Sequence, residues 1–207
     1  MNVGLLFLRL VVGALFLGHG SRKLFGWFDG PGIHDTGERF DQHGYRPGIA
    51  FATGVGLAEA VAGVLFVVGV FTPLAAALLV AVMVVAIGTV HAPRGIWNDD
   101  GGYEFHALVI AAAGTLAFTG PGSLSIGDGT SGAGWGFAAL LAGVALGLVT
   151  LAFRRPAAAP VDDDQPELDL TLRMEEDPEP ERAPTRDSTD IENERAEETW
   201  VDEERRA

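Results

Sequence analysis

Two opposite charges, Arg9 and Glu59, stand in otherwise apolar stretches of this sequence. Arg9 is the only charge within Val3–Leu17, and Glu59 is the only charge within Ile49–Phe71. An ionisable side chain inside a membrane costs roughly 2.5–3.5 kcal/mol on insertion scales unless a partner or a polar space offsets it. These two residues are therefore the first candidates for a binding or catalytic site.

Arg9 and Glu59 are predicted to lie level with each other if their helices form an antiparallel hairpin. Arg9 is 11 residues from Gly20, and Glu59 is 10 residues from Ile49. At about 1.5 Å per residue, both lie about 15 Å from the shared end, near the membrane midplane. An Arg9–Glu59 ion pair is the expected result. The pair could fix the register of two helices, or line a polar cavity for a proton, a quinone carbonyl or a small anion.

A second group of polar side chains stands at the ends of apolar segments. His19 and Lys23 follow the first segment, His91 ends the third, and Glu104 and His106 open the fourth. Imidazoles beside a carboxylate and an ammonium suit proton transfer or anion binding. Polar capping of helix ends is the plain alternative. No haem or metal site is expected, because the sequence shows neither paired histidines inside facing helices nor metal-ligand spacing.

The 207 residues divide by charge into an apolar part and an acidic tail. Residues 156–207 hold 19 acidic and 6 basic side chains, whereas residues 1–155 hold 9 and 8. The tail has too few apolar residues to offset its ordering entropy, so we expect it to be disordered and free to bind a cytoplasmic partner. The chain has no cysteine, which excludes a thiolate nucleophile and a Cys-ligated iron–sulfur cluster of its own. No nucleic-acid partner is expected.

Five apolar segments precede the tail: Val3–Leu17, Ile49–Phe71, Leu74–Val90, Phe105–Thr119 and Trp135–Phe153. They lack the polar residues that a soluble helical protein shows every three or four positions. Three of them approach the roughly 20 residues that a spanning helix needs. Their Gly and Ala content favours packed membrane helices over buried strands. The sequence therefore predicts an all-α polytopic membrane bundle in a lipid bilayer.

The distribution of positive charge predicts the orientation. Arg and Lys occur in the connections 19–48 and 91–104 and directly after the fifth segment, with none in the other two connections. By the positive-inside rule these connections and the tail are cytoplasmic, and the N-terminus faces outward across the plasma membrane. The first segment is expected to be retained, because it lacks a basic n-region and a clear small-x-small cleavage site.

Five motifs follow one another along the chain: "RLVVGALFLGHGSRKLF" (Arg9–Phe25), "GLAEAVAGVLFVVGVFTPLAA" (Gly56–Ala76), "MVVAIGTVHAP" (Met83–Pro93), "GGYEFHALVIAAAG" (Gly101–Gly114) and "TGPGSLSIGD" (Thr119–Asp128). Together they resemble the DoxX family of small bacterial and archaeal membrane proteins, which have a four-helix core. The resemblance covers about residues 4–128. The positions that match the family pattern are Arg9, Gly20, Lys23, Glu59, His91, Glu104 and Asp128.

The resemblance implies a domain organisation and a function. Residues 1–128 would form a DoxX-like four-helix core, residues 129–155 a linker and an added fifth transmembrane helix, and residues 156–207 the acidic tail. DoxX-like proteins are linked to membrane oxidoreductase complexes, and DoxD-type relatives resemble the membrane subunit of a thiosulfate:quinone oxidoreductase. The chain would then be the membrane subunit of a redox complex, with a quinone as its expected cofactor. The cofactor-binding candidates are Arg9, Glu59, His19, Lys23, His91 and Glu104, of which Arg9 and Glu59 are also the candidates for catalysis.

Two other functions stay open at this point. A bundle with charges at depth and histidines at one end also suits a stand-alone transporter for a small solute or acid. A scaffold without chemistry, in which Arg9 and Glu59 only specify packing, is the third possibility. Without cysteine or an evident redox ligand set, the chain by itself is not a complete oxidoreductase.

Overall fold

The computed structural model describes residues 2–127 and 131–155, and within these ranges all regular structure is helical. The longer helices are α1 (Asn2–Phe25), α2 (Gly32–Gln42), α3 (Gly48–Val68), α4 (Thr72–Ala86), α5 (Glu104–Thr119) and α6 (Ala133–Ala152). Three short turns follow α4: the π-helical η1 (Ile87–His91) and the 3₁₀ turns η2 (Ala92–Arg94) and η3 (Asn98–Asp100). The all-α prediction is confirmed. The predicted acidic tail and Asp128 lie outside the described residues.

Four helical segments are long and apolar enough to cross a membrane: Val3–Phe25, Gly48–Val68, Thr72–Arg94 and Ala133–Ala152. The third segment is the most buried of the four. In its most apolar 18-residue stretch 56% of the residues are buried, against 22–33% in the other three segments. α5 is also apolar, but its 16 residues fall short of the roughly 20 that a full span needs. The polytopic membrane bundle predicted from the sequence is thus confirmed as the fold class.

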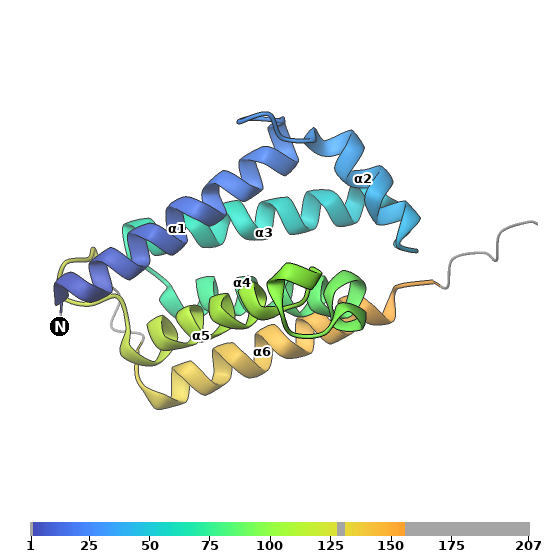
Figure 1. Ribbon diagram of the computed structural model, residues 1–207. Helices are drawn as coiled ribbons and strands as arrows, with labels where there is room; N and C mark the ends of the chain where they lie inside the picture. Colours follow the sequence, from blue (N-terminus) through green and yellow to red (C-terminus); the bar gives the residue numbers. More distant parts are fainter. Residues whose placement is uncertain (1, 128–130, 156–207) are drawn as a thin grey trace, which may run out of the picture. The chain divides into compact units, whose positions relative to one another are not determined.

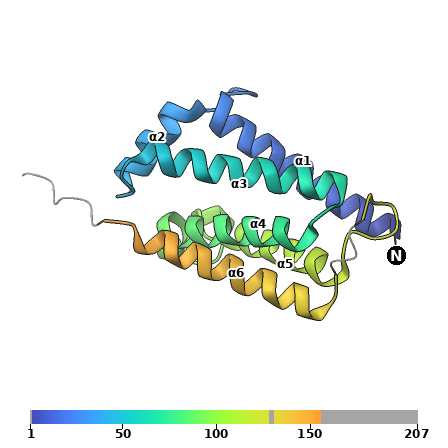
Figure 2. The same cartoon turned by 180° about the vertical axis from the view of Figure 1, so that it is seen from behind.

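The helices form two layers, which Figures 1 and 2 show from opposite sides. α1, α2 and α3 make one layer, and α4, α5 and α6 make the other. Within the layers α1 packs along α3, and α4 packs along both α5 and α6, while the contact of α3 with α4 joins the two. Side chains that are almost fully buried fill the junction, among them Phe16, Phe66, Leu79 and Leu116.

Glycine allows α1 and α3 to approach closely. A Cβ on Gly13 would lie 2.7 Å from the Gly63 carbonyl oxygen, and one on Gly20 would lie 2.6 Å from that of Gly56. Small residues at such positions let membrane helices bring their backbones together. These contacts also fix which residues of α1 face which residues of α3.

α2 is an element that the sequence analysis treated as loop. Its dipole is complemented by Asp35 in the first turn and Arg39 in the last. Thr36 and Gly37 are buried, and a Cβ on Gly37 would lie 2.8 Å from Ile49 of α3. α2 is polar overall and therefore gave no hydrophobic signal. It separates the end of α1 from the start of α3.

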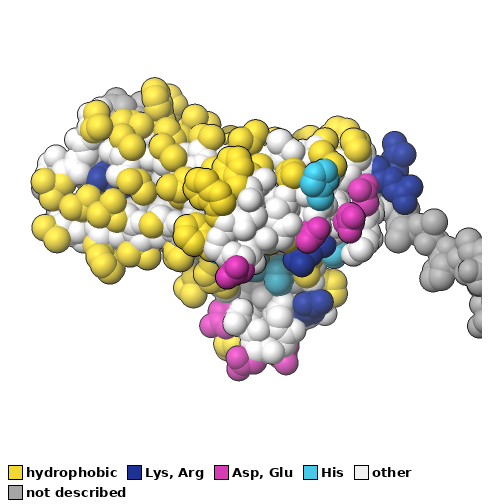
Figure 3. Space-filling model, turned by 90° about the horizontal axis from the view of Figure 1, so that it is seen from above, with side chains coloured by type: hydrophobic (Ala, Val, Ile, Leu, Met, Phe, Trp, Pro, Cys, Tyr) yellow, Lys and Arg dark blue, Asp and Glu magenta, His cyan; other side chains and the backbone are white. Residues whose placement is uncertain are grey.

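Charged side chains gather at one end of the described helices. Figure 3 shows apolar side chains along the left-hand part of the visible face, with nearly all acidic, basic and histidine side chains toward the right-hand end. At that end the backbone N–H of Arg155 donates to the Gly44 carbonyl at 2.9 Å, and Nε of Arg154 donates to the His43 carbonyl at 2.9 Å. The end of α6 therefore lies beside the segment that follows α2.

The close approach of α1 and α3 gives a testable prediction. Gly13→Ala should lower the free energy of unfolding of the detergent-solubilised protein by about 1–3 kcal/mol, because the added methyl overpacks the helix contact. Gly18→Ala is the matched control on the same helix, since a Cβ there would meet no atom within 4 Å. Alanine is the better helix former, so the control should be neutral or stabilising. Equal effects of the two substitutions would contradict this packing.

Candidate functional site

Glu59 forms a buried ion pair with Lys23. Glu59 is only 2% exposed, and its Oε1 accepts from the Lys23 ammonium, which reaches across from α1. The second carboxylate oxygen, Oε2, is buried and has no hydrogen-bond partner within residues 2–127 and 131–155. A buried acceptor without a donor is energetically costly. This oxygen is therefore available to a ligand or a proton.

Arg9 does not pair with Glu59, so the predicted Arg9–Glu59 ion pair is wrong. The Arg9 guanidinium donates to the carbonyls of Pro121 at 3.0 Å and Leu124 at 2.7 Å, in the segment after α5. It also lies against Gly69 at the end of α3, where an added Cβ would collide with it. Arg9 is thus about ten residues along α3 from Glu59, or about 15 Å.

The error lies in the assumed register of the hairpin. α1 continues to Phe25, and the glycine contacts place Gly20 opposite Gly56 and Ala60, not opposite Ile49. Because α2 lies between the two helices along the chain, the end of α1 and the start of α3 need not be level. The cation nearest to Glu59 is therefore the one near the end of α1, Lys23.

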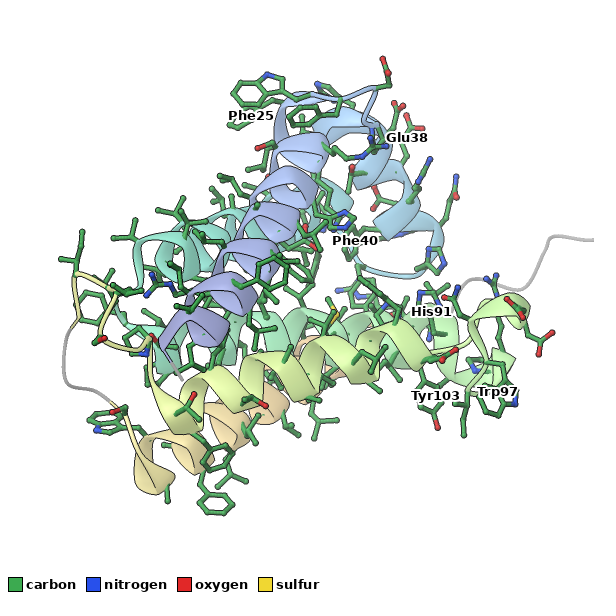
Figure 4. The ribbon with its side chains drawn as sticks, turned by 60° about the vertical axis from the view of Figure 1, so that its left-hand side comes forward. Phe25, Glu38, Phe40, His91, Trp97 and Tyr103 are labelled. Atoms are coloured by element: carbon green, nitrogen blue, oxygen red, sulfur yellow. The ribbon has the colours of Figure 1, made fainter. Side chains whose placement is uncertain are left out.

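A cavity of about 530 Å³ surrounds this ion pair between the two layers. Its walls come from α1, α2 and α3 on one side and from α4, η1 and α5 on the other. Figure 4 shows Phe40 of α2 and His91 of η1 on these two sides, and both residues line the cavity. Most of the wall is apolar, as in sites that take organic ligands, and a few polar groups converge on it.

Four histidines belong to the cavity wall: His19, His43, His91 and His106. The rings of His91 and His106 are 4.1 Å apart, centre to centre. Nδ1 of His91 lies 2.6 Å from the Gly101 carbonyl, so that nitrogen carries a proton and Nε2 remains for another partner. Nδ1 of His106 is buried and has no partner in the described part of the chain.

Of the predicted site residues, the structure brings Glu59, Lys23, His19 and His91 together around one cavity. Glu104 does not line it. Its Oε2 accepts the backbone N–H of Asn98 at 3.2 Å, so the carboxylate caps the loop before α5. From the sequence, Glu59 was expected at depth and the histidines at the helix ends, whereas in the structure they line the same cavity.

Residues of α2 and the turns were missed from the sequence. Arg39 and His43 line the cavity together with Arg94 of η2. The spacing of Thr36, Arg39, Phe40 and His43 by three or four residues was the available signal, because it places them on one helical face.

A pair of hydroxyl groups links the segment after α2 to the cavity wall at Thr89. The buried Tyr45 hydroxyl lies 2.7 Å from Thr89 Oγ1 in the π-helical turn η1. Such turns are frequent at functional sites, where they redirect side chains. The site therefore combines one carboxylate, one ammonium, two guanidinium groups and four imidazoles with a largely apolar wall. That combination can hold the polar head of an organic ligand and exchange protons with it.

Comparison with known proteins gives one match. The family model described as DoxX matches residues 4–92, which extend from α1 through η1. Arg9, His19, Lys23, Glu59 and His91 all fall within the matched segment. The resemblance noted from the sequence over residues 101–128 lies beyond that match. Neither a curated protein nor a solved structure matches the chain.

A double-mutant cycle tests the separation of Arg9 from Glu59. Arg9→Met and Glu59→Gln should each alter the thermal stability of the solubilised protein, and their effects should add within about 0.5 kcal/mol, as for sites without shared partners. Lys23→Met with Glu59→Gln is the matched cycle for the observed pair and should be strongly non-additive. Coupling in the first cycle as large as in the second would restore the Arg9–Glu59 pair.

Proposed function

Residues 4–92 of this chain belong to the DoxX family, and on that premise we propose that the chain is the membrane subunit of a redox complex whose cavity binds a quinone. One observation carries the proposal. Glu59 Oε2 and His106 Nδ1 are both buried and without partners among the described residues, and both residues line the same largely apolar cavity. Buried polar atoms in native proteins nearly always find a partner, so a ligand is expected to supply it.

The residues present fit a quinone headgroup. The Lys23 ammonium and an imidazole N–H of His106 would donate to its two carbonyl oxygens, and Glu59 Oε2 would accept from a hydroxyl of the reduced form. Phe16, Met83 and Phe105 supply apolar surface for the ring. A bound quinone would supply two-electron chemistry that the side chains of this chain lack. The histidines would move protons to and from the site.

The chain has no cysteine, so it has no thiol of its own to supply electrons to the quinone. We propose that a cytoplasmic redox enzyme supplies them and that the acidic segment 156–207 binds it. That segment carries 19 acidic residues and could attract a basic surface at a distance. Such attraction weakens as salt rises, so association through this segment would depend on ionic strength.

Transport of a small anion is the second candidate function. Three cationic side chains line the cavity, Lys23, Arg39 and Arg94, against the single carboxylate of Glu59. This balance favours an anionic solute at the charged end. Proteoliposome flux separates the two functions, since a redox subunit would move no solute.

The site gives a binding prediction. Glu59→Gln should weaken binding of a decyl-substituted benzoquinol to the full chain in nanodiscs by about tenfold, because a charge-assisted acceptor is replaced by an amide. Glu38→Gln, on the exposed side of α2 in Figure 4, is the matched control and should bind as wild type. Wild-type affinity in folded Glu59→Gln protein would argue against a role of this carboxylate in the site.

We also propose that the chain spans the plasma membrane with its N-terminus facing outward. The absence of cysteine makes labelling direct, since Asp35→Cys on α2 and Ser123→Cys after α5 each introduce one thiol. Both positions are exposed and lie toward opposite ends of the helices. In intact cells an impermeant maleimide should label the Ser123→Cys protein, and the Asp35→Cys protein only after permeabilisation. The reverse pattern would place the N-terminus in the cytoplasm.

A further inference from the structure

A second cavity, of about 480 Å³, lies between α3, α4 and α6. We refer to it as the flank groove. Its wall includes Phe51, Ala58, Leu78, Leu146, Val149 and Phe153. Thr150 supplies the only side-chain hydroxyl on this wall. It donates to the Leu146 carbonyl at 2.8 Å and therefore needs no hydrogen-bond acceptor from a ligand. The flank groove is therefore apolar, and in a bilayer its open side faces hydrocarbon.

The flank groove shares a wall with the cavity around the Lys23–Glu59 pair. Val55 of α3 and Val82 and Val85 of α4 line both spaces. They stand where α3 meets α4. The cavity around the ion pair, which we call the polar cavity for its charged groups, lies on one side of these valines, and the flank groove lies on the other. The three valines are thus a shared boundary between a cavity that carries charged groups and a groove that is apolar.

Small residues on α3 keep the flank groove hollow. Ala50, Gly54 and Ala58 recur at four-residue spacing, so they lie on one face, and all three line the flank groove. No backbone contact requires glycine at position 54, because a Cβ there would meet no atom within 4 Å. A glycine inside a helix costs about 0.5–1 kcal/mol relative to alanine. Glycine at position 54 therefore keeps the flank groove open to a molecule other than this chain.

We propose that the flank groove binds the hydrocarbon tail of the ligand whose head occupies the polar cavity, the tail passing the valine wall between α3 and α4. This inference rests on the proposed function and specifies its ligand as an amphiphile with an alkyl or prenyl tail. A polar occupant of the groove would find no partner for its hydrogen bonds, whereas a hydrocarbon chain needs none. The adjoining polar cavity distinguishes this tail from that of an ordinary membrane lipid.

Two benzoquinones with the same head, one tailless and one with a decyl tail, test the proposal on the full chain in detergent. The measured quantity is the ratio of their dissociation constants, taken within each variant. Val149→Trp fills the flank groove from α6, and Gly54→Leu fills it from α3. Leu148→Trp is the matched control, because Leu148 is 56% exposed and Val149 is 54% exposed, yet only Val149 lines the flank groove. Partition into micelles is the same for all variants and cancels in the comparison.

Both groove-filling variants should lose about five- to tenfold of the preference for the decyl quinone, since the tail forfeits its packing contacts. The Leu148→Trp control should keep the wild-type ratio. Wild-type ratios in Val149→Trp and Gly54→Leu would overturn the flank groove as a tail site while leaving quinone binding in the polar cavity intact. If the wild type binds neither quinone, the proposed function fails and this inference fails with it.

A decyl quinone with a photoreactive group at the end of its tail gives an independent readout. Cross-links concentrated on the α6 peptide that contains Val149 are expected. Cross-links spread evenly over the outer faces of α1 and α5 would show the tail lying in the detergent or lipid instead, as an ordinary lipid chain would, and would overturn the proposal.

Discussion

The carboxylate of Glu59 constrains the packing of the whole upper layer in Figure 1. An ionised glutamate in the middle of an apolar helix needs a partner, and the structure provides Lys23. The ammonium can reach it because glycines on α1 and α3 bring the two backbones together at a fixed register. Ion pair and glycine contacts thus support each other. The same register carries Arg9 to the far end, where it holds the segment after α5 through two carbonyls.

The cavity exists because the two layers meet tightly only along part of their length. Phe66, Leu79 and Leu116 are fully buried where the layers join. Around the ion pair the walls separate, and α2 together with the turn η1 closes the space. The polar atoms left unsatisfied there belong to Glu59 and His106. A purely structural ion pair would not need a cavity of this size beside it.

The sequence predicted the helices well because long apolar runs have a strong physical signature. It also identified the two buried charges, since charges at depth are rare. It failed on their pairing, because helix ends were taken as level when the polar α2 shifts one helix against the other. No local pattern encodes that shift. Only the contacts of Gly13 and Gly20 with α3 reveal it.

The same limit explains the partial prediction of the site. His19, Lys23 and His91 end helices that point the same way, so their gathering followed from topology. Glu104 was expected among them, but its carboxylate, at the start of α5, accepts the Asn98 N–H, while the neighbouring Phe105 and His106 line the cavity. Arg39 and His43 were missed because α2 is polar on average and so gave no apolar run. Side chains presented by a polar helix are the part of such a site that hydropathy cannot find.

The most direct test of the central claim is the quinone content of the protein purified in mild detergent from its native membrane. The account predicts a stoichiometric quinone with the wild type and its loss from Lys23→Met, with Arg46→Gln, an exposed residue outside the cavity, retaining it. Wild-type protein without quinone, or equal quinone in Lys23→Met, would contradict a site built on the Lys23–Glu59 pair.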